Sequence, residues 1–171
     1  MPSEIATLSF EESEPTMSSQ EFAYFLYLFR AAYGAALQIV PWQGITPEMV
    51  AADPAQHSRR FYESILRGSF SGDSVDKWFS EDLGEAELLI RKINKESPLI
   101  IWWDATIMTA LVLAVILAGG EVDLAKGRFK LKSLGHAIKE LREALSPGFG
   151  KSTSHTPSSQ HSHKKGQSTK R

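Results

Sequence analysis

The stretch that decides the fold is Leu99–Gly120, which reads LIIWWDATIMTALVLAVILAGG. Asp104 is its only charged residue, and the residues after it, 105–118, have no polar face. A helix that is apolar all round must be covered on every side, by the chain's own sheet, by another subunit or by lipid. The architecture and the role of the protein therefore depend on what covers this stretch.

Two interpretations of the stretch remain open, and Asp104 separates them. In the first, Asp104 is the N-cap of a buried helix over 105–118, and Gly119-Gly120 provides a left-handed stop. Such a helix is about 21 Å long, shorter than the roughly 30 Å hydrocarbon core of a bilayer. Pro98 and the β-favouring residues 99–103 then predict a strand before the helix.

In the second interpretation, a helix over 99–118 is long enough to span a membrane or insert into it. Asp104 would then lie in the hydrocarbon, at a cost of up to about 3 kcal/mol, with aromatic anchors beside it at the interface. In either case these side chains must be covered, by the chain's own sheet, by a partner or by lipid. The candidate interface or membrane residues are Trp102, Trp103, Asp104, Leu111, Leu113 and Ile116.

Length and composition indicate an ordinary globular chain. The 171 residues are 42% hydrophobic and 23% charged, which predicts a single domain over 1–146. Cysteine is absent. Disulfides and cysteine-based zinc sites are therefore excluded, and a cytoplasmic location is expected, with membrane association as the alternative. Residues 1–5 lack the basic and apolar regions of a signal peptide.

The C-terminal residues 147–171 form a polar, basic segment that we expect to be disordered. The net charge of the chain is −1, and these last 25 residues carry five Lys/Arg and no acidic residue, so the rest of the chain carries −6. Point charges of this kind are a candidate anion-binding site for phosphate groups of lipid or nucleic acid. The residues concerned are Lys164, Lys165, Lys170 and Arg171.

Metals and nucleic acid are not expected as ligands. His155, His161 and His163 would hold a transition metal only weakly in a disordered segment. We therefore predict no metal and no cofactor. The folded part shows no basic stripe interleaved with aromatic residues, so nucleic acid is not expected as a partner.

The periodicity of the remaining chain predicts an α+β fold. Its expected form is a small, mostly antiparallel sheet packed with two strongly apolar helices, 18–39 and 105–118, with helix 134–145 at an edge. Ser18-x-x-Glu21 is a capping-box pattern and Pro41 is the expected stop of the first helix. Strands are expected at 5–10, 86–94 and 99–103 and in a hairpin at 121–132, and further helices from 47, over 55–67 and over 74–83.

One group of side chains offers a candidate for chemistry. His57, Arg60 and Glu63 lie within two turns of the predicted helix 55–67, where an acid and a base could meet. The plainer interpretation is a solvated helix face with a charge pair. An enzyme would require these groups to line one concave pocket.

The function expected from these patterns is that of a non-enzymatic interaction or assembly protein. Its apolar helices, about 18–39 and 105–118, would be buried against a protein partner or in a homo-oligomer. A small membrane protein anchored by 99–118 is the alternative. An enzyme that uses the His57, Arg60 and Glu63 face is the third possibility.

Overall fold

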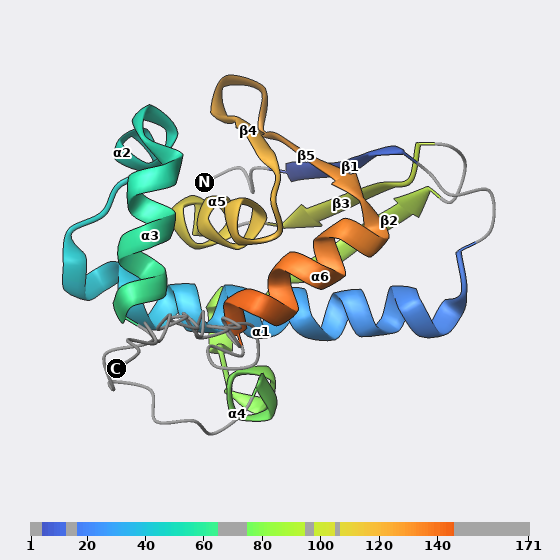
Figure 1. The fold of residues 1–171 in the computed structure, drawn as a ribbon, viewed down its shortest axis with the longest axis horizontal. Coiled ribbons are helices and arrows are strands. Elements are labelled where there is room, and N and C mark those ends of the chain that lie inside the picture. The colour runs from blue at the N-terminus through green and yellow to red at the C-terminus, as the bar shows by residue number, and fades with distance from the viewer. Residues whose placement is uncertain (1–4, 13–16, 65–74, 95–97, 105–106, 146–171) are drawn as a thin grey trace, which may run out of the picture.

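The computed structural model of the chain describes residues 5–12, 17–64, 75–94, 98–104 and 107–145 (Figure 1). The strands are β1 (Ile5–Glu12), β2 (Leu89–Asn94), β3 (Ile100–Asp104), β4 (Glu121–Asp123) and β5 (Arg128–Ser133). The helices are α1 (Ser19–Gln43), α2 (Pro47–Ala52), α3 (Pro54–Ser64), α4 (Val75–Ser80), α5 (Met108–Leu117) and α6 (Leu134–Leu145), with 3-10 turns η2 (Gly84–Ala86) and η3 (Leu124–Lys126).

The five strands form one mixed sheet with the order β2-β3-β1-β5-β4. β1 is its central strand and runs antiparallel to β3 and parallel to β5. The outer pairs, β2 with β3 and β4 with β5, are both antiparallel. The predicted α+β class with a mostly antiparallel sheet is confirmed, while the parallel pair of β1 and β5 was not predicted.

One face of the sheet carries the core. Ala6, Leu8 and Phe10 of β1 are each 1% exposed and alternate with residues that reach solvent. Helix α1 packs on this face, because Phe25 meets Phe10 edge to face with ring centroids 5.3 Å apart. In Figure 1, α1 runs below the sheet, and α6 lies across α1. The buried neighbours of β1 in the register are Ile101 and Trp103 on β3 and Phe129 and Leu131 on β5.

Helix α1 begins as predicted and ends later than predicted. The backbone N–H of Glu21 donates to Ser18 Oγ at 3.1 Å, and the Glu21 carboxylate accepts from the Ser18 N–H at 3.2 Å, which completes the capping box. The expected stop at Pro41 is wrong. The helix continues to Gln43 and ends at Gly44, whose φ of +59° is the left-handed conformation of a glycine C-cap.

The apolar helix α5 is covered by the chain itself. Eight of its ten residues are buried, and it contacts α1, α2, α3, α6 and the strands β4 and β5. Gly119, with φ +75°, and Gly120 follow it. A Cβ on Gly120 would come within 2.7 Å of the Lys130 carbonyl oxygen, so the predicted glycine stop is confirmed and is also a close packing contact.

Asp104 is not the N-cap of α5. It is the last residue of β3. Helix α5 begins at Met108, three residues after its expected start at residue 105. The ladder explains the difference, because Asp104 still pairs in register with Ile5 of β1 and Leu89 of β2. Strand pairing on both sides therefore outweighs the preference of aspartate for a helix start.

The C-terminal hairpin and helix agree with the prediction. β4 and β5 pair through the turn at η3, where Gly127 takes a φ of +57°. The backbone N–H of His136 then donates to Ser133 Oγ at 3.2 Å, which caps α6. β2 starts later than expected, at Leu89, and Ala86, the first residue of the expected strand, belongs to η2.

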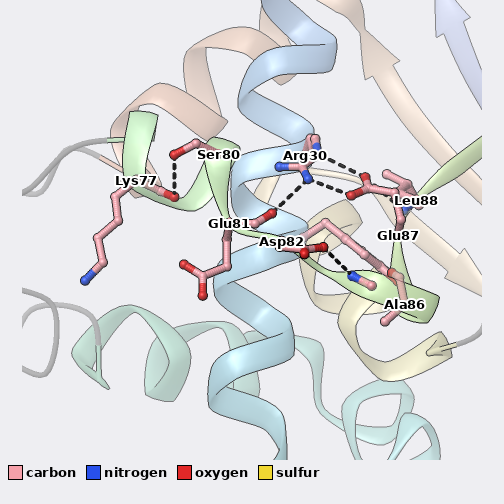
Figure 2. A network of polar contacts seen from close by, with 10 residues as sticks. Arg30, Lys77, Ser80, Glu81, Asp82, Ala86, Glu87 and Leu88 are labelled. Atoms are coloured by element: carbon pink, nitrogen blue, oxygen red, sulfur yellow. Dashed lines mark hydrogen bonds and ion pairs between the residues drawn. The ribbon is translucent and has the colours of Figure 1, made fainter.

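A charged network fixes α1 against the segment before β2 (Figure 2). Arg30 Nε donates to Glu87 Oε1 at 2.9 Å and Arg30 Nη2 to Glu87 Oε2 at 2.6 Å. The same Nη2 donates to the Glu81 carbonyl at 3.0 Å. Arg30 also lies over the Phe79 ring at 5.2 Å, so one side chain holds the segment from α4 to η2 on α1.

Candidate functional site: the open face of the sheet

The second face of the sheet, which we call the open face, carries side chains from all five strands. Two rows of residues cross it in register. Both rows have a small polar residue on β1 at the centre, a large apolar residue on β3 and a basic residue on β5. The first row is Lys92, Trp102, Thr7, Arg128 and Asp123, and the second is Asn94, Ile100, Ser9, Lys130 and Glu121.

Large apolar side chains reach solvent at one end of the open face. Ile5 is 56% exposed and Leu89 is 51% exposed, and they lie on either side of Asp104 in the register. Trp102 and Ile100 are half-buried on the neighbouring strand β3. Clustered apolar side chains with a polar surround are typical of a protein interaction surface.

Asp104 is buried on this face and forms an ion pair with Arg91. The register of β2 and β3 shifts between Ile90 and Lys92, and Arg91 lies at this bulge. Its Nε and Nη2 both contact Asp104 Oδ2, and the hydrogen bond to Asp104 raises the pKa of Arg91. Asp104 Oδ1 is buried with no hydrogen-bond partner among the described residues. The pair holds the edge strand to β3 at the apolar end of the face.

The charges of the open face lie on both sides of its central strand. On the β2 side, Lys92 Nζ lies 5.2 Å from the centroid of the Trp102 ring, a cation–π geometry. On the other side, Lys130 pairs with Glu11, and the hydrogen bond to Glu11 raises the pKa of Lys130. Farther out on β4, the face ends in the carboxylates of Glu121 and Asp123.

A groove lies elsewhere, between α3, the end of α5 and α6. Its volume is about 390 Å³. Tyr62 of α3, Ile116 of α5 and Ala144 of α6 give it an apolar part. Glu140 and Glu143 give it an acidic rim on the α6 side, and Arg59 lines the α3 side. Ile116 is one of the two half-buried residues of α5 and lines this groove, so the apolar helix approaches the surface here.

Five of the six candidate interface residues fall into two groups, and the sixth, Asp104, is the buried carboxylate of the open face. Trp103, Leu111 and Leu113 are at most 2% exposed inside the core of this chain. Trp102 lies on the open face and Ile116 in the groove, so these two keep accessible surface. The candidate anion-binding residues Lys164, Lys165, Lys170 and Arg171 and the three tail histidines lie outside the described residues.

The structure does not gather His57, Arg60 and Glu63 into one pocket. His57 is 4% exposed on the side of α3 that also buries Phe61, whereas Arg60 and Glu63 are exposed. The helical period explains the separation, because positions 57 and 61 share the face that packs inward. Within the described ranges, no group of three or more His, Asp or Glu residues is arranged to hold a metal ion.

Sequence reasoning missed Ile5, Leu89 and Arg91 as surface residues of the site. The alternation of β1 contained a signal, since Ile5 has the opposite parity to Ala6, Leu8 and Phe10. The bulge that brings Arg91 to Asp104 has no comparable local signature. Only the pairing of strands distant in sequence reveals it.

Comparison of the chain with protein-family models, with curated proteins and with solved structures finds no match. Among the described residues, no helix combines the length and the apolar character that a membrane span requires. The candidate function therefore depends on the geometry of the chain itself.

Proposed function

We propose that the protein is a non-enzymatic assembly protein that binds a second copy of itself through the open face of the sheet. The observation that carries this proposal is the row across β1 that has a basic end at Lys92 on β2 and an acidic end at Asp123 on β4. The apolar helices then serve to fill the core behind the sheet, and the partner meets the strands.

A two-fold axis along β1 makes the open face complementary to itself. Because β1 is the middle strand, this rotation places β2 over β4 of the second copy and β3 over β5. Lys92 then faces Asp123 of the second copy, and Trp102 faces Arg128 of the second copy in a further cation–π contact. Two sheets packed in this way lie about 10 Å apart with their strands within about 30° of each other.

The centre of this arrangement suits close packing. Thr7 and Ser9 are small, so two β1 strands can approach each other without a clash. Ile5 meets Ile5 of the second copy and removes an exposed apolar side chain from water. Glu11 of one copy would face Glu11 of the other, and the charge of each is already offset by the Lys130 of its own chain.

Pairing through the edge strand β2 is the less favourable geometry for a dimer. Arg91 and Lys92 would bring like charges together across an antiparallel β2 pair. The bulge at Arg91 also interrupts the ladder that a neighbouring strand would need. Charged residues and bulges are features by which proteins prevent edge-to-edge pairing.

The absence of cysteine suits assembly in the cytoplasm, the location that we propose.

The test is the molar mass of the protein in solution. Sedimentation equilibrium of the wild type should give twice the 19.0 kDa of the single chain. Ile5→Glu places two carboxylates opposite each other on the two-fold axis, at the apolar end of the interface, and should raise the dimer dissociation constant by about 100-fold or more. Met49→Glu, at a residue 44% exposed on α2, is the matched control and should leave the dimer unchanged.

Two results would overturn this proposal. The first is a wild-type chain that stays monomeric at high micromolar concentration. The second is an Ile5→Glu variant that keeps its native circular dichroism spectrum and still dimerises as tightly as the wild type, because a dimer of that kind uses another surface.

A further inference from the structure

We infer that the groove between α3, α5 and α6 binds the segment of this same chain that follows α6, with Phe149 as the apolar anchor and Lys151 as the charged one. The groove is lined by residues of α3, α5 and α6 and by no residue of the open face, so this inference does not depend on the proposed dimer.

The first argument is the composition of the segment beside that of the groove. Residues 146–151 read SPGFGK, and Phe149 is the only aromatic residue after α6. The groove offers Tyr62, Ile116 and Ala144 as an apolar surface. Burying an aromatic ring there removes apolar area from water on both sides of the contact.

The second argument is charge. Glu140 and Glu143 line the α6 side of the groove, and Glu143 is exposed. Arg59 lines the α3 side, so the two carboxylates outnumber the basic side chain and the α6 rim is acidic. The residues after α6 carry five Lys/Arg and no acidic residue, so their charge is opposite to that of this rim. Lys151, two residues beyond Phe149, is the first basic residue of the segment and would pair with Glu143.

The third argument is reach. α6 ends at Leu145, and the groove is lined by the residue just before it, Ala144. The four residues from Leu145 to Phe149 span up to about 14 Å. Pro147-Gly148 is a dipeptide typical of turns, so the chain can reverse there and bring Phe149 back over α6.

The experiment uses a disulfide, because the natural chain has no cysteine and an introduced pair is therefore unique. Ser58→Cys places a thiol in the groove on α3, and Gly150→Cys places the second thiol beside Phe149. The rate of disulfide formation in a glutathione buffer is measured on the full chain at low micromolar concentration. The matched control is the same cysteine pair with Phe149→Ser and Lys151→Glu.

If the segment docks as inferred, an intramolecular disulfide forms in the Ser58→Cys, Gly150→Cys protein. In the control, disulfide formation should be at least about ten-fold slower, because the anchors set the effective concentration of the two thiols. Equal rates in the two proteins would overturn the inference, and so would the absence of a cross-link. A disulfide that joins two molecules would also overturn it, because the occupant would then be a second copy. Circular dichroism confirms that both proteins are folded.

Discussion

At the scale of single residues, Asp104 shows how a buried charge is accommodated at a surface that must stay accessible. Ile5 and Leu89 flank it in the sheet, and Arg91 covers it from the bulge in β2. The Asp104 side chain is 9% exposed and that of Arg91 is 60% exposed, so the arginine screens the carboxylate from water and keeps its own charge at the surface. The ion pair therefore couples the core to the open face.

Removal of Arg91 should destabilise the protein through Asp104. In Arg91→Met, the buried carboxylate has lost its partner, and an unpaired buried polar group costs about 1 to 3 kcal/mol. Urea denaturation followed by circular dichroism should show a loss of that size in the free energy of unfolding.

The double variant Arg91→Met with Asp104→Asn is the control for this mechanism. It should be more stable than Arg91→Met alone, because the amide does not carry an unpaired charge into the interior. If the double variant loses the sum of the two single effects, the two side chains do not act as a pair.

At the scale of elements, the start of α1 makes one contribution to stability that depends on pH. The hydroxyl and the backbone N–H of Ser18 both hydrogen-bond to Glu21 and lower its pKa below the ordinary 4.5. A carboxyl group whose pKa is lower in the folded chain stabilises the fold above its unfolded pKa. This contribution is lost as the pH falls through the folded pKa.

Glu21→Gln should therefore flatten the fall in melting temperature below about pH 4.5, where the wild type loses the contribution of the capping box. Ser18→Ala should lower the stability at neutral pH by about 0.5 to 2 kcal/mol, as expected for the loss of an N-cap. Thermal unfolding is measured between pH 2.5 and 7.

The Ser18→Ala background provides the control. There the Glu21→Gln substitution should have a smaller effect on the pH dependence, because the hydroxyl is gone and only the backbone N–H of residue 18 still donates to the carboxylate. An unchanged effect in that background would show that Glu21 acts through other groups.

Much of the element pattern could be predicted from local sequence. The capping box at Ser18, the glycine stop after α5, the β4–β5 hairpin and the Ser133 cap each depend on neighbouring residues, and the structure has all of them. The position of Asp104 could not be predicted, because it depends on pairing with Ile5, about a hundred residues away in the sequence. The open face escaped prediction for the same reason, since its rows join strands that lie far apart in the chain.

At the scale of the whole molecule, Arg30 connects the long helix to the segment that leads into the edge strand. Arg30→Lys keeps the charge but cannot reproduce the two-pronged contact with Glu87 and the bond to the Glu81 carbonyl. We expect amide hydrogen exchange in residues 81–89 to become at least about ten-fold faster, while α5 keeps its protection.

Glu87→Gln is the companion variant. In the Arg30→Lys background it should add little further exchange in the same segment, because the ion pair is already broken. Uniformly faster exchange in α5 and in this segment would instead show that Arg30 stabilises the whole fold.

The parallel pair of β1 and β5 has a consequence for folding during synthesis on the ribosome. Thr7 of the first strand lies beside Arg128, so the innermost strand of the sheet lacks one neighbour until nearly all of the folded chain has been translated. At roughly 5 to 20 residues per second, a ribosome needs about 6 to 25 seconds to travel that distance. Throughout that interval Leu8 and Phe10 lack their neighbours on β5, Phe129 and Leu131. The nascent chain is therefore most prone to aggregation before its C-terminal third has been synthesised.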